Sequence, residues 1–173
     1  MERTLKRPNG SVFVSLTFIP EEEYIFVGWD GYLDLEMVKQ GSEELLAMIE
    51  ETKSQKTLIC NKKITGPWNK ANSWYAASWN PRAKKAGLKY MAVVVSDNIF
   101  AQLSLQGFEK VCNGNYSVFC HNDAEVAREW LLNQNKTGRD SINGQLHYSY
   151  PTTPLTCNED AGSVLQPVSL YTI

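Results

Sequence analysis

The feature that most limits the possible folds is an unbroken apolar run, YMAVVV, at residues 90–95. A strand with one face in water alternates apolar and polar residues, whereas a continuous apolar strand is typical of a parallel sheet that is covered on both faces. Six residues suit a strand better than a helix. The run therefore predicts an α/β fold, and it is the best candidate for the centre of the sheet.

Other short segments have the composition of strands. Residues 11–18, SVFVSLTF, alternate apolar side chains, and residues 24–29, YIFVGW, are again aromatic and β-branched. The charged turn between them predicts an antiparallel hairpin. Two further short strands are expected at residues 57–60 and 116–120.

Helical periodicity follows the hairpin and each later strand. The first helix is expected to end near Thr52. Pro81 predicts a kink in the second helix, or a restart at Asn80, before that helix ends at Gly87. The predicted N-caps are Asp34, Asn69, either Ser96 or Asp97, and Asn122 in a capping box with Glu125. The predicted element order is ββαβαβαβα. The strand-helix-strand units make neighbouring strands parallel, so together with the hairpin they predict a mixed sheet. The order of the strands in the sheet is left open.

The chain divides into two parts by composition. Residues 1–135 carry the periodic segments and form the predicted α/β domain, whereas residues 136–173 are rich in Ser, Thr, Pro, Asn and Gly and lack periodicity. Two interpretations of this tail stay open. It is either a flexible extension, or Leu146, Tyr148 and Tyr150 pack as an extended segment on the domain or on a partner.

Composition excludes several classes of protein. A formal net charge of -2 leaves no broad basic surface for nucleic acid. No apolar run is long enough for a membrane helix, and the N-terminus lacks a signal peptide, so we expect a cytoplasmic location. The cysteines are then reduced packing residues, and their spacing predicts neither a metal site nor a cofactor. They are Cys60, Cys112, Cys120 and Cys157.

Polar residues follow each strand that feeds a helix. The carboxyl ends of parallel strands meet at one edge of a sheet, where ligands tend to bind. The segments expected at this edge are Trp29-Asp30-Gly31, Asn61-Lys62-Lys63, Ser96-Asp97-Asn98 and His121-Asn122-Asp123. Many of these residues have a simpler role, since Ser, Asn and Asp at a helix start bind free backbone N–H groups.

The loop NKKITGPW, residues 61–68, is the strongest candidate for a binding site. Gly66 and Pro67 set a rigid turn, and Trp68 stands where a loop normally carries a polar residue. The cationic side chains beside it could attract an anion. The predicted binding residues for a protein partner or a small anionic ligand are Trp29, Asn61, Lys63, Trp68 and Trp74. The alternative is that Trp68 only anchors the loop onto the sheet.

An enzymatic alternative uses His121 with Asp30 or Asp97 as an acid/base pair at the same edge. A Cys-His pair is not expected, because Cys120 and His121 are neighbours on a strand and point to opposite faces. No common nucleotide-binding, zinc-protease or hydrolase motif occurs in the chain.

The segments YIFVGWDGY, LICNKKITGPW, SWNPRAKKAGLKYMAVV and DNIFAQLS, with a closing AREWL helix, resemble a family of small bacterial proteins. This family is STAS/SEC14-like and similar to the sporulation anti-sigma-factor antagonist SpoIIAA. The resemblance covers about residues 11–134. It implies a SpoIIAA-like α/β fold that acts as a protein-interaction or small-ligand regulatory module.

One departure from that pattern concerns regulation. The antagonists in this superfamily carry a phosphorylated serine in the turn that corresponds to CNKKITGPW, where this chain has Asn61 and Lys62, and Thr65 is the only hydroxyl nearby. We therefore expect a non-catalytic binding module without a phosphoserine switch. A homodimer is a further expectation, because the open strand order allows the 11–18 strand to lie at a sheet edge, where it would need a cover or a pairing partner.

Overall fold

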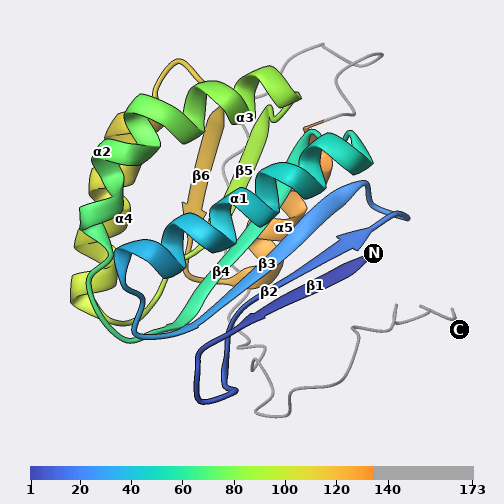
Figure 1. The fold of residues 1–173 in the computed structure, drawn as a ribbon. Coiled ribbons are helices and arrows are strands. Elements are labelled where there is room, and N and C mark those ends of the chain that lie inside the picture. The colour runs from blue at the N-terminus through green and yellow to red at the C-terminus, as the bar shows by residue number, and fades with distance from the viewer. Residues whose placement is uncertain (135–173) are drawn as a thin grey trace, which may run out of the picture.

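The structure, a computed structural model, describes residues 1–134. Six strands form one sheet in the order β1-β2-β3-β4-β5-β6, which is also their order along the chain (Figure 1). They are β1 Glu2–Lys6, β2 Val12–Ile19, β3 Tyr24–Gly31, β4 Lys56–Ile64, β5 Tyr90–Val94 and β6 Ser117–His121. Strands β1 to β3 pair antiparallel and β3 to β6 pair parallel. The predicted α/β class and N-terminal hairpin are confirmed, and the predictions for residues 136–173 lie outside the described residues.

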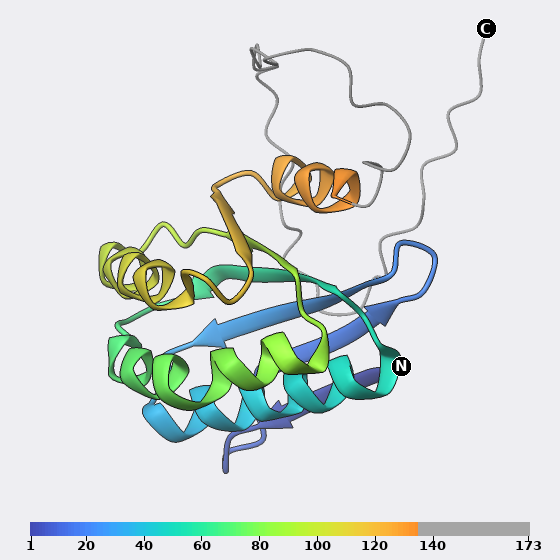
Figure 2. The ribbon, with the colours of Figure 1, turned by 90° about the horizontal axis from the view of Figure 1, so that it is seen from above.

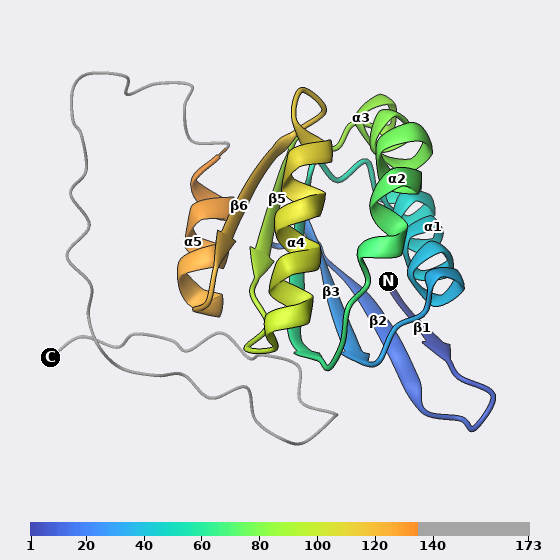
Figure 3. The same ribbon diagram turned by 90° about the vertical axis from the view of Figure 1, so that its left-hand side faces the viewer.

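The helices form two unequal layers. They are α1 Leu35–Thr52, a segment made of η1 Asn69–Ala71, α2 Asn72–Trp74, η2 Tyr75–Trp79 and α3 Asn80–Ala86, then α4 Ile99–Cys112 and α5 Ala124–Asn133. Helices α1 to α4 cover one face of the sheet, and α5 alone lies on the other, against β4, β5 and β6 (Figures 2 and 3). The three crossovers, from β3 to β4, from β4 to β5 and from β5 to β6, each step to the next strand in the same direction. Crossovers of one hand that do so pass over the same face of the sheet. Helix α1, the segment from η1 to α3, and α4 therefore form one layer, which we call the three-helix layer.

Two expectations about the sheet are wrong. The 11–18 segment is not an edge strand, because β1 pairs along β2 with Leu5 opposite Val14. The apolar run at 90–95 is not central, because β5 lies next to the edge strand β6. The physical basis of the second prediction still holds, since β5 is covered on both faces. Met91 and Val93 belong to the cluster under the three-helix layer, and the cluster under α5 contains Ala92 and Val94.

The segment between β4 and β5 changes its winding before Pro81. Residues Tyr75–Trp79 form a π-helical turn, and α3 begins at Asn80 with the proline in its first turn. A proline clashes with the carbonyl four residues before it in a regular helix, and a widened turn relieves this clash. The predicted restart at Asn80 and the left-handed end at Gly87, with φ 113°, are both confirmed. The predicted Asn69 cap is wrong, because no side-chain cap is formed there.

The caps of α4 and α5 lie one residue or more beyond the predicted positions. Asn98 accepts hydrogen bonds from the backbone N–H groups of Phe100 and Ala101, and Asp123 accepts those of Glu125 and Val126. The predicted caps at these helices, Ser96 or Asp97 and Asn122, are therefore wrong. Asp34 is confirmed as the cap of α1.

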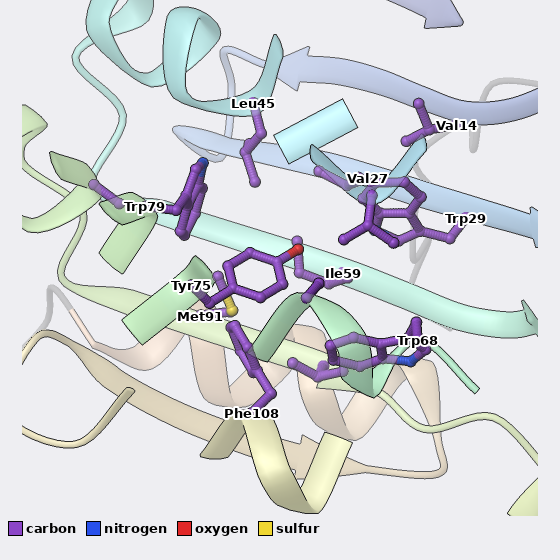
Figure 4. Packing of buried hydrophobic residues seen from close by; sticks show 14 of the residues in the cluster. Val14, Val27, Trp29, Leu45, Ile59, Trp68, Tyr75, Trp79, Met91 and Phe108 are labelled. Carbon is purple, nitrogen blue, oxygen red and sulfur yellow. The ribbon is translucent and has the colours of Figure 1, made fainter. Parts of the chain in front are cut away.

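The core beneath the three-helix layer is unusually aromatic (Figure 4). The Tyr75 ring lies 4.8 Å from that of Phe108 and 5.7 Å from that of Trp79, and Trp68 lies 5.8 Å from Phe108. All of these contacts are edge-to-face, the arrangement in which the positive edge of one ring meets the negative face of another. Each such pair adds about 0.5–1.5 kcal/mol beyond the burial of its area.

Candidate functional site

The carboxyl ends of the four parallel strands meet at one edge of the sheet. The backbone N–H of Thr65 donates to the carbonyl of Gly31 at 3.2 Å, and the Ser96 hydroxyl donates to the carbonyl of Ile64 at 3.0 Å. The N–H of Val95 donates to the carbonyl of His121 at 2.9 Å. Segments that are far apart in sequence are therefore hydrogen-bonded into a continuous edge, as parallel pairing predicts.

The five predicted binding residues divide into three groups. Trp29, Asn61 and Trp68 are buried and line one cavity under the three-helix layer, whereas Lys63 is exposed on the outside. Trp74 is partly buried against Tyr75, with ring centres 5.1 Å apart, and is not part of the cavity lining. The expectation that Trp68 is free to contact a partner is wrong, since only 9% of it is exposed.

The cavity has a volume of about 50 Å³. Its walls are largely apolar, and Figure 4 shows Trp29, Ile59, Trp68 and Tyr75 around the same region. The Tyr75 and Ser42 hydroxyl groups bind each other at 2.7 Å, and burial raises the pKa of Tyr75 well above its usual range, so the phenol is neutral. Trp79 donates its indole N–H to the Ser42 carbonyl at 2.7 Å.

Several large apolar side chains are exposed at the carboxyl edge. Tyr32, in the loop after β3, is 61% exposed, and the first turns of α4 expose Ile99, Phe100 and Leu103 by 58%, 57% and 55%. We call these four residues the edge patch. Sequence reasoning did not identify them, although a signal is present. The IFAQLSLQGF stretch of α4 has apolar residues on the buried face, such as Leu105 and Phe108, and also on the opposite face.

The loop that contains Trp68 separates the two halves of the edge patch. The Trp68 backbone N–H donates to the Ser104 hydroxyl of α4 at 3.0 Å, and the Asn98 amide donates to the Thr65 carbonyl at 3.1 Å. On the other side, the Tyr32 ring lies against Gly66, where a Cβ atom would approach the ring to 2.8 Å. The edge patch therefore lies on a backbone frame that hydrogen bonds and close packing hold in place.

The charged groups at this edge are mostly engaged. Lys62 forms an ion pair with Asp97 at 3.2 Å, and Arg7 donates to the carbonyl oxygens of Asp30 and Tyr32. Lys63 is exposed, but none of the residues that line the cavity is charged. The edge thus offers a small anion little more than one solvated lysine.

The acid/base alternative does not fit the register of the sheet. Asp30 lies on β3 and His121 on β6, so they are three strand spacings, or about 14 Å, apart. The Nδ1 atom of His121 accepts the backbone N–H of Asp123 at 3.0 Å. Asp97 is paired with Lys62. These positions contradict an Asp30–His121 pair and leave Asp97 and His121 with other partners.

The cysteines that the structure describes are packing residues. Burial raises the pKa of the Cys112 thiol from 9.0 to about 12, and it raises that of Cys120 further. The Cys112 thiol, the Tyr116 hydroxyl and the Asn80 amide form a closed ring of hydrogen bonds. Within residues 1–134 no group of His, Cys, Asp and Glu side chains could hold a metal ion. Over the same residues no helix is long and apolar enough to cross a membrane.

Comparison of the chain with family models, with curated proteins and with solved structures finds no match.

Proposed function

We propose that this protein is a non-catalytic binding module that docks a protein partner on the edge patch. The observation that carries the proposal is the exposure of Tyr32, Ile99, Phe100 and Leu103 by more than half each at the carboxyl edge of the sheet. Scattered exposed apolar residues are normal on soluble proteins, but contiguous ones commonly mark interaction sites. Here three of them share the first turns of one helix.

The form of the edge patch suits recognition. Aromatic and large aliphatic side chains act as anchors in protein interfaces, and anchors bind best when their backbone is already ordered. The bonds of Asn98 to Thr65 and of Ser104 to Trp68 order the frame on which Phe100 and Leu103 stand. Docking would therefore cost little backbone entropy.

The chemistry of the edge patch indicates the chemistry of the partner. Residues 99–108 of α4 contain no charged side chain, and the nearest ion pair, Lys62–Asp97, is already internally satisfied. A partner segment that presents apolar, uncharged side chains fits such a surface without leaving a buried charge unpaired. The small anionic ligand considered from the sequence is less well supported, because Lys63 is the only charged member of the predicted set.

We also propose that the protein is a member of the STAS/SEC14-like family that it resembles, that it is bacterial, and that it is located in the cytoplasm. A mixed sheet with an N-terminal hairpin is compatible with that family, whose members are interaction modules. Asn61 and Lys62 stand in place of the acid and serine of a phosphorylated turn. We therefore propose binding that no serine phosphorylation at this turn controls.

Site-specific photo-crosslinking in the source cells tests the proposal. A photo-reactive phenylalanine analogue at Phe100 should give a crosslinked species of discrete mass, because the partner covers that side chain. The same analogue at Lys85, an exposed residue of α3, is the matched control and should give no such species. A second crosslinking site at Tyr32 should give the same species as Phe100.

A substitution within the edge patch tests whether crosslinking depends on it. The Leu103→Ser substitution should weaken the crosslink from Tyr32 at least several-fold while leaving the far-ultraviolet circular dichroism unchanged. Equal crosslinking from Phe100 and Lys85, or none from Phe100 and Tyr32, would show that the edge patch is not a docking surface. A crosslinked species of twice the chain mass would identify a second copy of this chain as the occupant, in place of a different protein.

A further inference from the structure

The two edge strands of the sheet differ in how they are protected. Strand β1 carries Glu2, Arg3 and Lys6, and its register shifts between Leu5 and Lys6. Charges and irregular pairing prevent an edge strand from adding a further strand. Strand β6, SVFCH, contains no Lys, Arg, Asp or Glu, and its register with β5 is regular. Among the described residues no strand pairs with the outer side of β6, so β6 is an unprotected edge (Figure 3).

Two residues of β6 present their backbone groups to this outer side. The Ser117 N–H donates to the Lys89 carbonyl just before β5, and the His121 carbonyl accepts an N–H just after β5, both at 2.9 Å. Backbone groups of successive residues in a strand point in alternate directions, so the odd-numbered residues of β6 face β5. The N–H and C=O groups of Val118 and Cys120 therefore point away from the sheet, and no described residue bonds to them.

A groove adjoins the start of this edge. Its volume is about 1220 Å³, and Ser117 and Val118 of β6 form part of its wall. The rest of the wall comes from the ends of α3 and α4 and from the loop that joins α4 to β6, at the amino edge of the sheet. Val118 thus belongs both to the unprotected edge and to the groove.

The groove carries an excess of positive charge. Its lining contains Lys84, Lys89 and Lys110 but only one carboxylate, that of Glu109. Within residues 1–134 none of these lysines forms an ion pair, and Lys84 donates to the Gly114 carbonyl at 2.7 Å. A lysine in the last turn of a helix offsets the helix dipole, as Lys84 and Lys110 do, but Lys89 lies on no helix. The groove therefore attracts acidic groups.

A strand added beside β6 would have two different faces. Val118 packs on the core under the three-helix layer, whereas Phe119 points to the other face and stacks on Trp130 of α5 with ring centres 5.0 Å apart. Side chains alternate between the two faces along a strand. One face of the added strand thus lies on the side of the lysine-lined groove, and the other lies on the side of half-buried aromatic rings. Alternating acidic and apolar residues suit these surroundings.

We propose that β6 and the adjoining groove dock an extended segment of a partner protein in which acidic and apolar residues alternate. The segment adds a strand to the sheet through the outward groups of Val118 and Cys120, and its acidic side chains lie near Lys89 and Lys110. In this mode of recognition the main-chain hydrogen bonds give affinity and alternate side chains give specificity. The site is separate from the edge patch, which lies at the carboxyl edge of the sheet.

Synthetic peptides test the pairing of the backbone. The parent probe is a hexapeptide of alternating Asp and Val with blocked ends. In ¹H–¹⁵N spectra of the whole protein it should shift the Val118 and Cys120 amide resonances saturably at millimolar concentration. Two further versions carry N-methyl groups on either the three Asp or the three Val residues. Only one set of N–H groups faces β6, so one version should bind like the parent and the other should lose saturable binding.

Three other probes test the side chains. A peptide with Lys in place of each Asp should give no saturable shift of the same resonances. A peptide with the three Val residues first and the three Asp residues last has the same charge without the alternation, and it should bind several-fold more weakly. A six-nucleotide thymidine oligonucleotide carries negative charge without a peptide backbone, and it should leave the Val118 and Cys120 resonances unchanged.

Variants assign the binding to the two parts of the site. Val118→Pro removes one outward N–H and keeps the bonds to β5, so the parent peptide should lose saturable binding. The double variant Lys89→Gln, Lys110→Gln should weaken binding several-fold. Lys70→Gln is the matched control, since Lys70 is an exposed lysine of η1 outside the groove, and it should bind like the unmodified protein. If Val118→Pro fails to fold, the two N-methylated peptides decide.

Several results would overturn the inference. They are the absence of a saturable shift with the parent peptide, equal binding of the two N-methylated versions, unchanged binding by the double lysine variant, and a shift of the Val118 and Cys120 resonances by the oligonucleotide. A dimer in native mass that Val118→Pro abolishes would assign β6 to a second copy of this chain instead. The photo-crosslinking experiment at Phe100 does not involve this edge, so failure of the β6 site and failure of the edge patch can be distinguished.

Discussion

Gly41 lies in the middle of α1, where glycine normally destabilises a helix by about 1 kcal/mol relative to alanine. The structure gives a reason for it. A Cβ atom on Gly41 would lie 2.4 Å from Cη2 of Trp29 and 3.1 Å from Cγ1 of Val14. Because Gly41 has no side chain, α1 can approach the sheet closely and Trp29 can occupy its position at the cavity wall.

We expect Gly41→Ala to destabilise the protein by about 1–3 kcal/mol, because overpacking against a large buried ring outweighs the gain in helix propensity. Urea denaturation followed by circular dichroism measures this change. Gly107→Ala in α4 is the control, since its Cβ would meet only the amide end of Asn72 and would disturb one hydrogen bond, from that amide to the Ser104 carbonyl, in place of a large buried ring. Gly107→Ala should change stability by less than half as much. A stabilising effect of Gly41→Ala would contradict the packing argument.

The buried thiol of Cys112 predicts a pH dependence. Its pKa is about 12 in the folded protein and near 9.0 in the unfolded chain, so folded and unfolded states bind the proton equally below pH 8. Above pH 9 the unfolded thiol ionises first, so stability is lost as pH rises from about 9 toward 12. Between pH 8 and pH 10 this thiol should cost about 1 kcal/mol.

Urea denaturation under reducing conditions at pH 8 and pH 10 measures this loss. Cys112→Ala removes the titrating group and should show a loss smaller by about 1 kcal/mol, whatever its own effect at pH 8. Cys120, whose pKa burial also raises, contributes equally to both proteins and cancels in the comparison. An identical pH dependence in the two proteins would mean that Cys112 ionises as easily folded as unfolded.

At the scale of single elements, the start of α4 shows how a cap is selected. Asn98 caps the helix and also donates to the Thr65 carbonyl, so it joins α4 to the loop that contains Trp68. We expect Asn98→Ala to cost about 1–2 kcal/mol because both free N–H groups lose their acceptor. Asp97→Ala is the control and should change stability by less than about 0.5 kcal/mol, since Asp97 is 87% exposed and makes one surface ion pair.

Urea denaturation of both variants decides between the two caps. An equal loss of unfolding free energy in the two variants, or a larger loss for Asp97→Ala, would indicate that Asp97 caps α4, as one of the two sequence predictions has it. Because Asn98 also positions the frame of the edge patch, its variant should in addition reduce crosslinking from Phe100.

These caps illustrate what could be predicted from sequence. The existence of α4 and α5 follows from their apolar periodicity, but Ser96, Asp97 and Asn98 can all cap a helix. Tertiary contacts select among them, because the Ser96 hydroxyl donates to the Ile64 carbonyl and its oxygen accepts the backbone N–H of Asn98, which holds Ser96 before the start of the helix. The same limit applies to Trp68. Its residue type predicts a large contact, but only the packing of α4 determines whether that contact lies inside or outside the domain.

At the scale of the whole molecule, the convergence of Asp30, Asn61, Ser96 and His121 at one edge followed from parallel pairing, without knowledge of the strand order. The edge patch did not follow, because the exposure of Phe100 depends on which face of α4 meets the sheet. Strand β1 also escaped prediction, since ERTLK is short and charged and has no apolar alternation of its own. Its structure comes from its neighbour β2, which provides the pairing partner.

This dependence gives β1 a testable role at the edge of the sheet. The apolar strand β2, VFVSLTFI, has its outer hydrogen-bonding groups covered by β1. Removal of residues 1–6 would expose that edge, and exposed apolar edge strands template pairing with other chains. We therefore expect the truncated protein to self-associate at micromolar concentrations where the full chain does not, as measured by light scattering and native mass.

The control for this truncation is Arg3→Ala, because Arg3 also bridges β1 to α1 through Glu44 and Glu51. This variant loses the ion pairs but keeps the strand, and it should stay in the same oligomeric state as the unmodified chain. A truncated protein that also keeps that state would show that β2 is protected by its own twist or side chains. If self-association occurred in Arg3→Ala as well, the α1 contacts would be responsible, and β1 would matter as an anchor and not as a cover.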